Sequence, residues 1–490
     1  MLAQAGQQQH SEMSTEAQQT HSTEAAVIPI PSRIVGSPHR FRALALARLR
    51  GSGFRTRRLA YALGTSVASK VFGVFAQFIA LPIAIRALGI DHFAIYAMAM
   101  ASSAWITLVG LGIGPGLTVS VVAARAAADK RRETQLFASA MLPTLLITGS
   151  VLAVLLPIVS AARVTAIFGS QYAPSRYALL HCLQFVILLS AAQILLSVVE
   201  ATQAGYQEHY RMNLAAMCGS AISVPLIILT GRTAPTAFAL LMATQLPAVA
   251  SRMVNAVIFL RRNKHLRPVT RALDARTSRA LLKDGAAFST VSVGSFVNTS
   301  LLTLLVARFT NSATTATFAA AQGIFSLLFG LISMLTVPLS PAVSDSAVKA
   351  DVPWLRRAYA ILLRYSLAYG IAGAAFFAVF GCAALRLWYG KTVAPTQILM
   401  NGFGAYFALG VWEHAHHMFL IGLRQISRPS LLFFSRSAVG TMGAALIVRA
   451  WGADWVLLSA CLLTASTTAV IFHRLVRREL LLLGNTGSPS

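Results

Sequence analysis

Apolar residues form twelve runs of about 18 to 26 residues, which shorter polar segments separate. A helix rises 1.5 Å per residue, so a run of this length crosses the roughly 30 Å hydrocarbon core of a bilayer. The pattern therefore predicts an all-α polytopic membrane protein with about 12 transmembrane helices. The expected spans are 59–85, 93–117, 136–161, 177–199, 213–230 and 236–260, followed by 285–307, 316–339, 359–382, 397–419, 431–448 and 455–475.

The composition is that of a membrane protein, and it argues against nucleic acid, metal ions and cofactors as partners. Only 11% of the 490 residues are charged, against roughly 25% in soluble proteins. The net charge of +26 would suit nucleic acid, but the basic residues lie between apolar runs rather than in a domain with interleaved aromatic residues. We therefore expect no nucleic-acid partner. The four cysteines lie in or beside apolar runs without ligand spacing, so no metal site or cofactor is predicted.

The distribution of basic residues predicts the topology. Of 41 lysines and arginines, 31 fall on the side of the N-terminus and eight on the opposite side, while Lys70 and Arg252 lie inside spans. Because cytoplasmic loops are enriched in lysine and arginine, the positive-inside rule places both termini in the cytoplasm. A cleaved signal peptide is not expected, since the first apolar run begins near residue 59.

The chain is expected to consist of five parts. They are a cytoplasmic tail (1–58, disordered and then basic), a six-helix lobe (59–260), a basic cytoplasmic linker (261–284), a second six-helix lobe (285–475) and a short cytoplasmic tail (476–490). The basic stretch 33–58 suits either an interfacial helix on anionic lipid or a flank that fixes topology. A faint internal repeat with a spacing of about 222 residues relates the two lobes and predicts a central cavity between them.

Several short motifs resemble the Wzx-type polysaccharide flippases of the multidrug/oligosaccharidyl-lipid/polysaccharide (MOP) exporter superfamily. They are Arg86-Ala-Leu-Gly-Ile-Asp-His-Phe-Ala-Ile-Tyr96, Leu111-Gly-Ile-Gly-Pro-Gly116, and Pro338-Leu-Ser-Pro-Ala-Val-Ser-Asp345 with Trp354-Leu-Arg-Arg357. The resemblance covers residues 59–475 in order and spacing. It implies a MATE-like, two-lobed bundle in a bacterial inner membrane that alternates between inward-open and outward-open states.

The implied cargo is an undecaprenyl-pyrophosphate-linked oligosaccharide, moved to the periplasmic leaflet for exopolysaccharide, capsule or O-antigen synthesis. Partners would be this cargo, membrane lipids, and the polymerase and chain-length regulator of a polysaccharide pathway. Many relatives carry an acidic residue early in the seventh helix, where this chain has Asn298. This departure weakens any inference of ion coupling at that position.

Other functions fit less well. A cation-coupled multidrug exporter would favour carboxylates within the spans, where this chain has nearly none. A lipid II flippase usually has two further helices, for which we find no room before residue 59 or after residue 475. A membrane-embedded polymerase or ligase needs a large periplasmic loop and a catalytic constellation, and we find neither. The chain is therefore not expected to be an enzyme.

Basic residues at membrane depth are the first candidates for binding the diphosphate. Lys70 lies halfway along the first span, where a lysine costs roughly 2.5 to 3.5 kcal/mol to insert, so it is predicted to face a cavity. Its alternative is burial against the carbonyls of a neighbouring helix. Arg252 is a candidate for capturing the diphosphate at entry, and Arg308 lies near the periplasmic end of its span. Snorkelling to the headgroups is the alternative for both arginines.

Two further groups complete the candidate residues. Gln77, Gln193 and Asn298 lie near mid-span and could bind sugar hydroxyls, although helix-to-helix hydrogen bonds explain them equally well. Glu413 and His417 are four residues apart on one helical face, which suggests a charge-assisted pair and a candidate proton relay. The alternative for this pair is an interfacial polar cluster.

Overall fold

The computed structural model describes residues 54–108, 114–266, 272–283, 300–336, 339–348, 350–390, 393–423, 425 and 427–486, and these ranges contain no strand. The chain divides into the units Met1–Ala60 and Tyr61–Ser490, and the second holds the features discussed below. In the first half the helices are α3 (Phe54–Leu108), α4 (Gly114–Ala126), α5 (Lys130–Ile158), α6 (Ala161–Phe168), η1 (Ser170–Tyr172), α7 (Arg176–Gly205), α8 (His209–Thr233) and α9 (Ala237–Arg262).

The helices of the second half follow in the same manner. They are α11 (Leu302–Phe309), α12 (Ser312–Thr336), α13 (Leu339–Val348), α14 (Val352–Ala375), η4 (Phe376–Phe380), α15 (Gly381–Tyr389), α16 (Gln397–Gly422), α17 (Ser427–Trp451), η5 (Ala453–Trp455), α18 (Leu458–Leu463), η6 (Thr464–Thr468) and α19 (Ala469–Thr486). The all-helical fold is confirmed. The expected linker 261–284 and the start of the second lobe fall partly outside the described residues.

Apolar helices of spanning length are frequent. Among the described residues, nine helices are long and apolar enough to cross a membrane, and shorter apolar helices occupy Gly64–Ala80 and Gly116–Ala126. Helix α16, an expected span, is not among the nine. It carries Glu413 and three histidines and packs against α12, α13, α14 and α19, so it can tolerate polar residues that a lipid-facing helix cannot.

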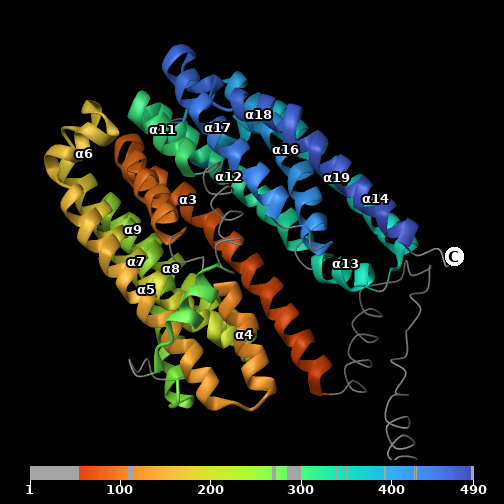
Figure 1. The fold of residues 1–490 in the computed structure, drawn as a ribbon. Helices are drawn as coiled ribbons and strands as arrows, with labels where there is room; N and C mark the ends of the chain where they lie inside the picture. Colours follow the sequence, from red (N-terminus) through yellow and green to blue (C-terminus); the bar gives the residue numbers. More distant parts are fainter. Residues whose placement is uncertain are drawn as a thin grey trace, which may run out of the picture. The chain divides into compact units, whose positions relative to one another are not determined.

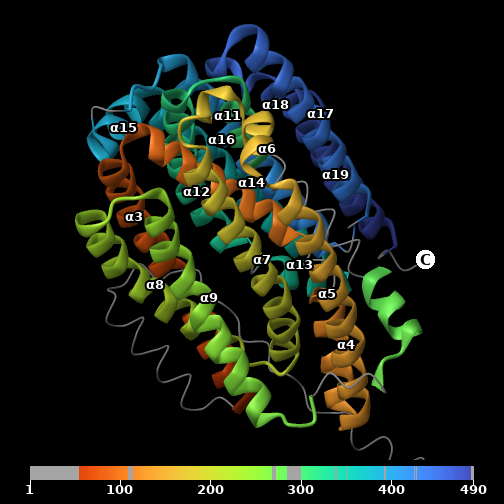
Figure 2. The ribbon, with the colours of Figure 1, turned by 90° about the vertical axis from the view of Figure 1, so that its left-hand side faces the viewer.

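The helices gather into two sets within the second unit (Figure 1). In the first set α4, α5 and α9 pack on α7, and α8 packs along α9. In the second set α12, α14 and α19 pack on α16, while α17 packs on α18 (Figures 1 and 2). The largest buried apolar cluster draws residues from both sets, including Phe93, Leu183, Phe318 and Phe403.

The structure bears on two expected boundaries. The second span was expected to continue to Leu117; the described part of α3 ends at Leu108, α4 begins at Gly114, and residues 109–113 lie outside the described ranges. The break expected between the first two spans is present as a bend within α3 at Gly89, whose φ of 71° and ψ of 179° are non-helical. Glycine tolerates this positive φ because it has no Cβ atom.

The internal repeat recurs in the backbone at the predicted spacing. Ala128 and Ala350, which are 222 residues apart, both have a φ of 54°. Each precedes an aspartate that caps the next helix: Asp129 accepts from the Arg132 amide and Asp351 from the Trp354 amide. Non-glycine residues rarely adopt this conformation, so its recurrence at this spacing supports the repeat, which stays a prediction.

Candidate functional site

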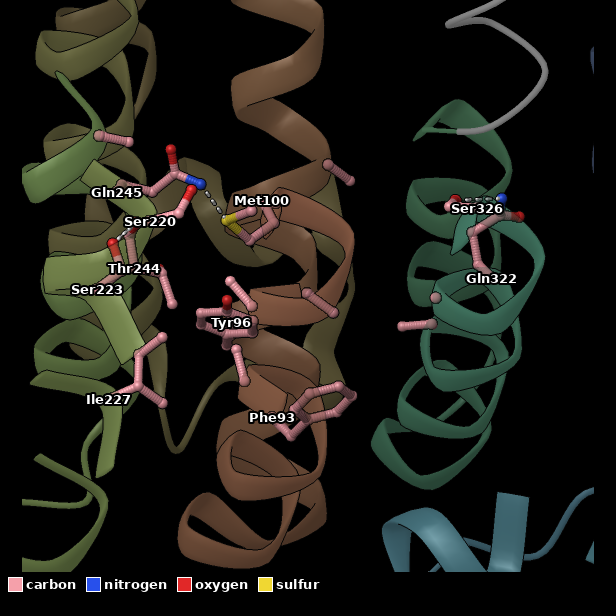
Figure 3. A pocket seen from close by; sticks show the side chains of 18 of the residues that line it. Phe93, Tyr96, Met100, Ser220, Ser223, Ile227, Thr244, Gln245, Gln322 and Ser326 are labelled. Atoms are coloured by element: carbon pink, nitrogen blue, oxygen red, sulfur yellow. Dashed lines mark hydrogen bonds between the residues drawn. The ribbon is translucent and has the colours of Figure 1, made fainter. Parts of the chain in front are cut away.

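A cavity of about 530 Å³ lies between the helix sets. Its walls are formed by α3, α8 and α9 on one side and by α12 with Ser300 and Thr303 on the other, as Figure 3 shows for its labelled residues. Cavities of this size commonly bind small molecules or parts of larger ones. The polar side chains in its lining are Tyr96, Ser220, Ser223, Thr244, Gln245, Ser300, Thr303, Gln322 and Ser326.

The lining is polar but uncharged. No aspartate, glutamate, lysine, arginine or histidine is among the lining residues that the structure describes. Hydroxyl and amide groups can each donate and accept hydrogen bonds, as can the hydroxyls of a sugar. The cavity therefore suits a neutral, hydroxyl-rich ligand.

Backbone carbonyls of the same helix or a neighbouring one accept hydrogen bonds from hydroxyl groups of the lining, such as that of Ser223, whereas the side-chain amides of Gln245 and Gln322 lack strong partners. Ser223 bonds with the Gly219 carbonyl at 2.9 Å and with the Thr244 carbonyl at 3.2 Å. The Gln245 amide nitrogen contacts only a weak acceptor, the Met100 sulfur, at 2.9 Å. The Gln322 amide nitrogen lies 3.4 Å from the Ser326 hydroxyl, and its buried Oε1 atom has no hydrogen-bond partner. A buried oxygen without a partner costs about 1 to 3 kcal/mol, so a ligand or water that donates to it is favoured.

Close packing of small residues holds the wall beside the cavity in place. A Cβ atom added to Gly219 of α8 would lie 2.6 Å from the Ser251 hydroxyl and 2.8 Å from the Ala248 Cα atom of α9. Only glycine permits this approach. It brings Ser220 and Ser223 of α8 beside Thr244 and Gln245 of α9.

Three of the predicted binding residues cannot be placed. The side chains of Lys70 and Gln77, both within α3, and the whole of Asn298 lie outside the part of the chain that the structure describes. Gln193 is half-buried on α7 but does not line the cavity, and Arg308 is exposed at the end of α11. Their predicted roles in binding stay predictions.

Arg252 lies away from the cavity lining and forms an ion pair. Its guanidinium donates twice to the Glu200 carboxylate of α7, with both N···O distances 2.6 Å. One turn further along both helices, Gln203 and Asn255 exchange hydrogen bonds of 2.7 and 3.3 Å. Sequence reasoning missed Glu200 because the expected span ended at residue 199, whereas α7 continues to Gly205.

Glu413 also pairs with an arginine, rather than with His417 as predicted. The Arg436 guanidinium donates to its carboxylate at 2.9 Å, and both side chains are at most 5% exposed. His417 instead lies between the rings of Phe433 and Phe472, 5.5 and 5.8 Å away. Arg436 was counted with the basic residues on the side of the N-terminus although it lies within the expected span 431–448, and α17 carries it into the bundle.

The remaining histidines of α16 form separate contacts with hydroxyl groups. His414 lies 2.8 Å from the Thr336 hydroxyl, and His416 lies 2.8 Å from the Tyr359 hydroxyl, which also contacts His473 at 2.8 Å. No group of three or more histidine, cysteine or acidic residues among those described has the geometry of a metal site. A proton relay through Glu413 and His417 stays a prediction.

A second buried carboxylate, that of Glu133, joins the ends of α7 and α9 in the first set. Glu133 is 4% exposed, accepts a hydrogen bond from Tyr206 and lies 2.9 Å from His265, just beyond α9. The Arg125 guanidinium lies 3.9 Å from the centre of the Tyr206 ring. Burial, followed by the hydrogen bond to Glu133, raises the pKa of Tyr206, so its phenol stays protonated as a donor.

At the opposite end of the bundle from Glu133, hydrogen bonds join the first helix set to the second. Arg86 of α3 donates to the carbonyls of Leu387 and Trp388 at 3.3 and 3.1 Å, and the Trp388 indole donates to the Phe78 carbonyl at 3.0 Å. Gln171 of η1 donates to the Ala307 and Thr310 carbonyls at 2.7 and 2.8 Å. The topology prediction places this end on the periplasmic side.

Comparison with known proteins identifies both a family and a fold. The model of a family described as polysaccharide biosynthesis protein matches residues 63–347. No curated protein matches the chain significantly.

Solved transporter structures share the fold at low sequence identity. An inward-facing multidrug resistance MATE family transporter of the MOP superfamily has a TM-score of 0.73 at 16% identity, over 85% of this chain and 96% of the other. An outward-facing MATE family structure gives 0.63 at 15% identity, over 86% and 96%. A MOP superfamily transporter from Pyrococcus furiosus, whose binding pocket is described as having reverse polarity, also gives 0.63 at 15% identity, over 86% and 96%. These likenesses establish a MATE-like fold.

Proposed function

Because this chain belongs to the polysaccharide biosynthesis protein family, we propose that it flips an undecaprenyl-pyrophosphate-linked oligosaccharide from the cytoplasmic to the periplasmic leaflet of a bacterial inner membrane. The fold is that of transporters rather than of enzymes. A glycan cannot enter hydrocarbon without losing its hydrogen bonds to water, so a flippase must replace them along its path.

The observation that carries the proposal is a cavity whose described lining is uncharged and carries hydrogen-bonding amides on both sides. Gln245 belongs to the first helix set and Gln322 to the second, and both line the same space (Figure 3). The buried, unpaired Oε1 atom of Gln322 would accept a hydrogen bond from a sugar hydroxyl once the side chain turns toward the cavity. A glycan bound to both sets would link cargo binding to their relative movement.

Lys70 and Gln77 remain proposed contributors from α3. Lys70 precedes the lining residue Gly73 by three positions, and Gln77 precedes Ala80 by three. Residues three apart in a helix are neighbours on its surface, so this spacing supports a place for both beside the cavity. The lysine would then meet the diphosphate and the glutamine a sugar.

The contacts at the predicted periplasmic end support an alternating mechanism. Arg86 and Gln171 hold carbonyl groups of the second set without any charged partner, so each bond can be exchanged for water when the sets separate. We propose that these contacts close the outer gate while cargo loads from the cytoplasmic side. The polymerase and chain-length regulator of a polysaccharide pathway would act on the product.

Deleting the gene and locating the lipid-linked oligosaccharide tests the proposal. We expect the precursor to accumulate in the inner leaflet, out of reach of a glycan-cleaving enzyme added to spheroplasts. Restoring the gene should return it to the outer leaflet. A full complement of accessible precursor in the deletion strain contradicts the flippase.

A multidrug exporter is the rival function, because MATE family transporters share the fold. It predicts that the deletion strain becomes sensitive to cationic drugs while its surface polysaccharide is unchanged. The uncharged lining favours a glycan over a cation.

A further inference from the structure

A second hollow, of about 340 Å³, lies within the second helix set between α12 and α14. Its lining, which we call the α12–α14 groove, is Ile332, Thr336, Leu339, Trp354, Arg357, Ala358, Ile361, Leu362, Tyr365 and Ser366. A hydrogen bond of 2.7 Å from the Tyr369 hydroxyl to the Leu328 carbonyl joins the two helices just beyond the groove. The groove is therefore closed toward the membrane centre and continues toward the start of α14.

The open end of the groove carries a positive charge. Arg357 is exposed in the second turn of α14, one turn after Trp354, which is 36% exposed. This is the end that the distribution of basic residues predicts to be cytoplasmic. A guanidinium above an apolar groove is complementary to a lipid with an anionic phosphate head.

The groove is long enough for part of a hydrocarbon chain. From Arg357 to Ser366 it follows nine residues of α14, or about 13.5 Å. The cargo of the proposed function carries one isoprenoid chain, whereas a phospholipid carries two, so we commit to a single chain as the occupant. The Ser366 hydroxyl at the far end is buried and has no hydrogen-bond partner.

Helix α12 borders both the groove and the central cavity. Gln322 and Ser326 line the cavity, and Ile332 and Thr336 of the same helix line the groove. With the phosphate at Arg357, the head group would leave the groove at its cytoplasmic end and would have to enter the cavity from that side, while the lipid chain points along α12.

We propose that the α12–α14 groove is a loading site for a single-chain isoprenoid phosphate, the lipid end of the cargo, with Arg357 bound to the phosphate. This proposal rests on the proposed function. It assigns the lipid and the glycan to separate sites, an apolar groove with a cation at its mouth and a cavity whose described lining is polar and uncharged. Arg357 would hold the phosphate during loading, and Lys70 would meet it once the cargo is in the cavity.

Binding of undecaprenyl phosphate to the purified full-length chain tests the groove. The protein is placed in nanodiscs of dioleoylphosphatidylcholine, and the bound lipid is counted by native mass spectrometry. We expect Arg357→Gln to weaken binding about tenfold, as loss of one charge-assisted hydrogen bond predicts. The adjacent Arg356→Gln, at an exposed position that does not line the groove, should bind like the wild type.

A second matched pair tests the shape of the groove. Ala358→Phe places a ring in the groove and should block binding, whereas Ala360→Phe, on the same helix but outside the lining, should not. Equal binding within both pairs overturns the proposal, as does a wild-type chain that binds no undecaprenyl phosphate. If an equal concentration of dioleoylphosphatidylglycerol displaces the bound undecaprenyl phosphate, the groove binds ordinary phospholipid and the proposal is overturned.

Failure of the proposed function gives a different result. If undecaprenyl phosphate binds through Arg357 but gene deletion leaves the precursor accessible in the outer leaflet, then the flippase is wrong and the groove stands. If deletion traps the precursor but Arg357→Gln binds normally, the flippase stands and the groove is wrong.

Discussion

The ion pairs within the helix sets and the wall of the cavity use polar residues in opposite ways. Glu200 with Arg252, and Glu413 with Arg436, form charge-assisted bonds of 2.6 to 2.9 Å within a single set. The described cavity lining contains no such charge and leaves an amide oxygen of Gln322 without a partner. The charges are therefore paired within each set, whereas the buried amide oxygen of Gln322 at the cavity wall leaves a hydrogen bond for a ligand to make.

The largest expected effect comes from breaking the more buried ion pair. Arg436→Leu leaves the Glu413 carboxylate buried without its cation, and this should lower the free energy of unfolding by about 3 to 5 kcal/mol. Thermal unfolding followed by size-exclusion chromatography measures the loss. The double variant Glu413→Gln with Arg436→Leu should recover most of it, since no unpaired charge remains. A single variant as stable as the wild type contradicts a structural role.

An intermediate effect is expected in the cavity. Gln322→Leu removes the unpaired acceptor and should slow transport of lipid-linked oligosaccharide into the outer leaflet about tenfold with little change in stability. Gln193→Leu is the matched control, because Gln193 is half-buried in a helix but does not line the cavity. Equal losses in the two variants would contradict the assignment of the glycan to this cavity.

A smaller effect is expected from the more exposed ion pair. Arg252 and Glu200 are 29% and 18% exposed, so Arg252→Gln should lower stability by about 1 to 2 kcal/mol. The double variant Arg252→Gln with Glu200→Gln keeps a hydrogen-bonded pair and should transport normally. Slow transport by a stable double variant would instead support capture of the diphosphate by Arg252.

The smallest effect tests the equivalence of the two halves. Ala350→Gly relieves a positive φ and should raise the free energy of unfolding by about 0.5 to 1 kcal/mol, as should Ala128→Gly. Ala347→Gly, inside α13, should lower it by about 1 kcal/mol. If all three glycines destabilise alike, the shared left-handed conformation is not the cause.

The sequence predicted the parts of the fold that depend on local pattern. The apolar runs became helices, and the repeat spacing reappeared at Ala128 and Ala350 because caps and turns are local features. The expected end of the second span at Leu117 is not tested in the same way, because the described part of α3 ends at Leu108 and residues 109–113 lie outside the described ranges.

The candidate site was harder to predict, because it depends on which helices meet. Arg252 and Glu200 are 52 residues apart, and only the packing of α7 on α9 joins them. Gln245 and Gln322 lie in apolar runs just as Gln193 does, and sequence alone does not show which of them faces a cavity. The periodicity of apolar residues and the composition of a segment identify a helix, but they do not show which helices pack against it.

An experimental structure with lipid-linked oligosaccharide bound tests the central claim most directly. The account predicts sugar density within hydrogen-bonding distance of Gln322 and Gln245, with both ion pairs intact. Sugar or diphosphate density on Arg252, with Glu200 displaced and the cavity empty, would contradict it.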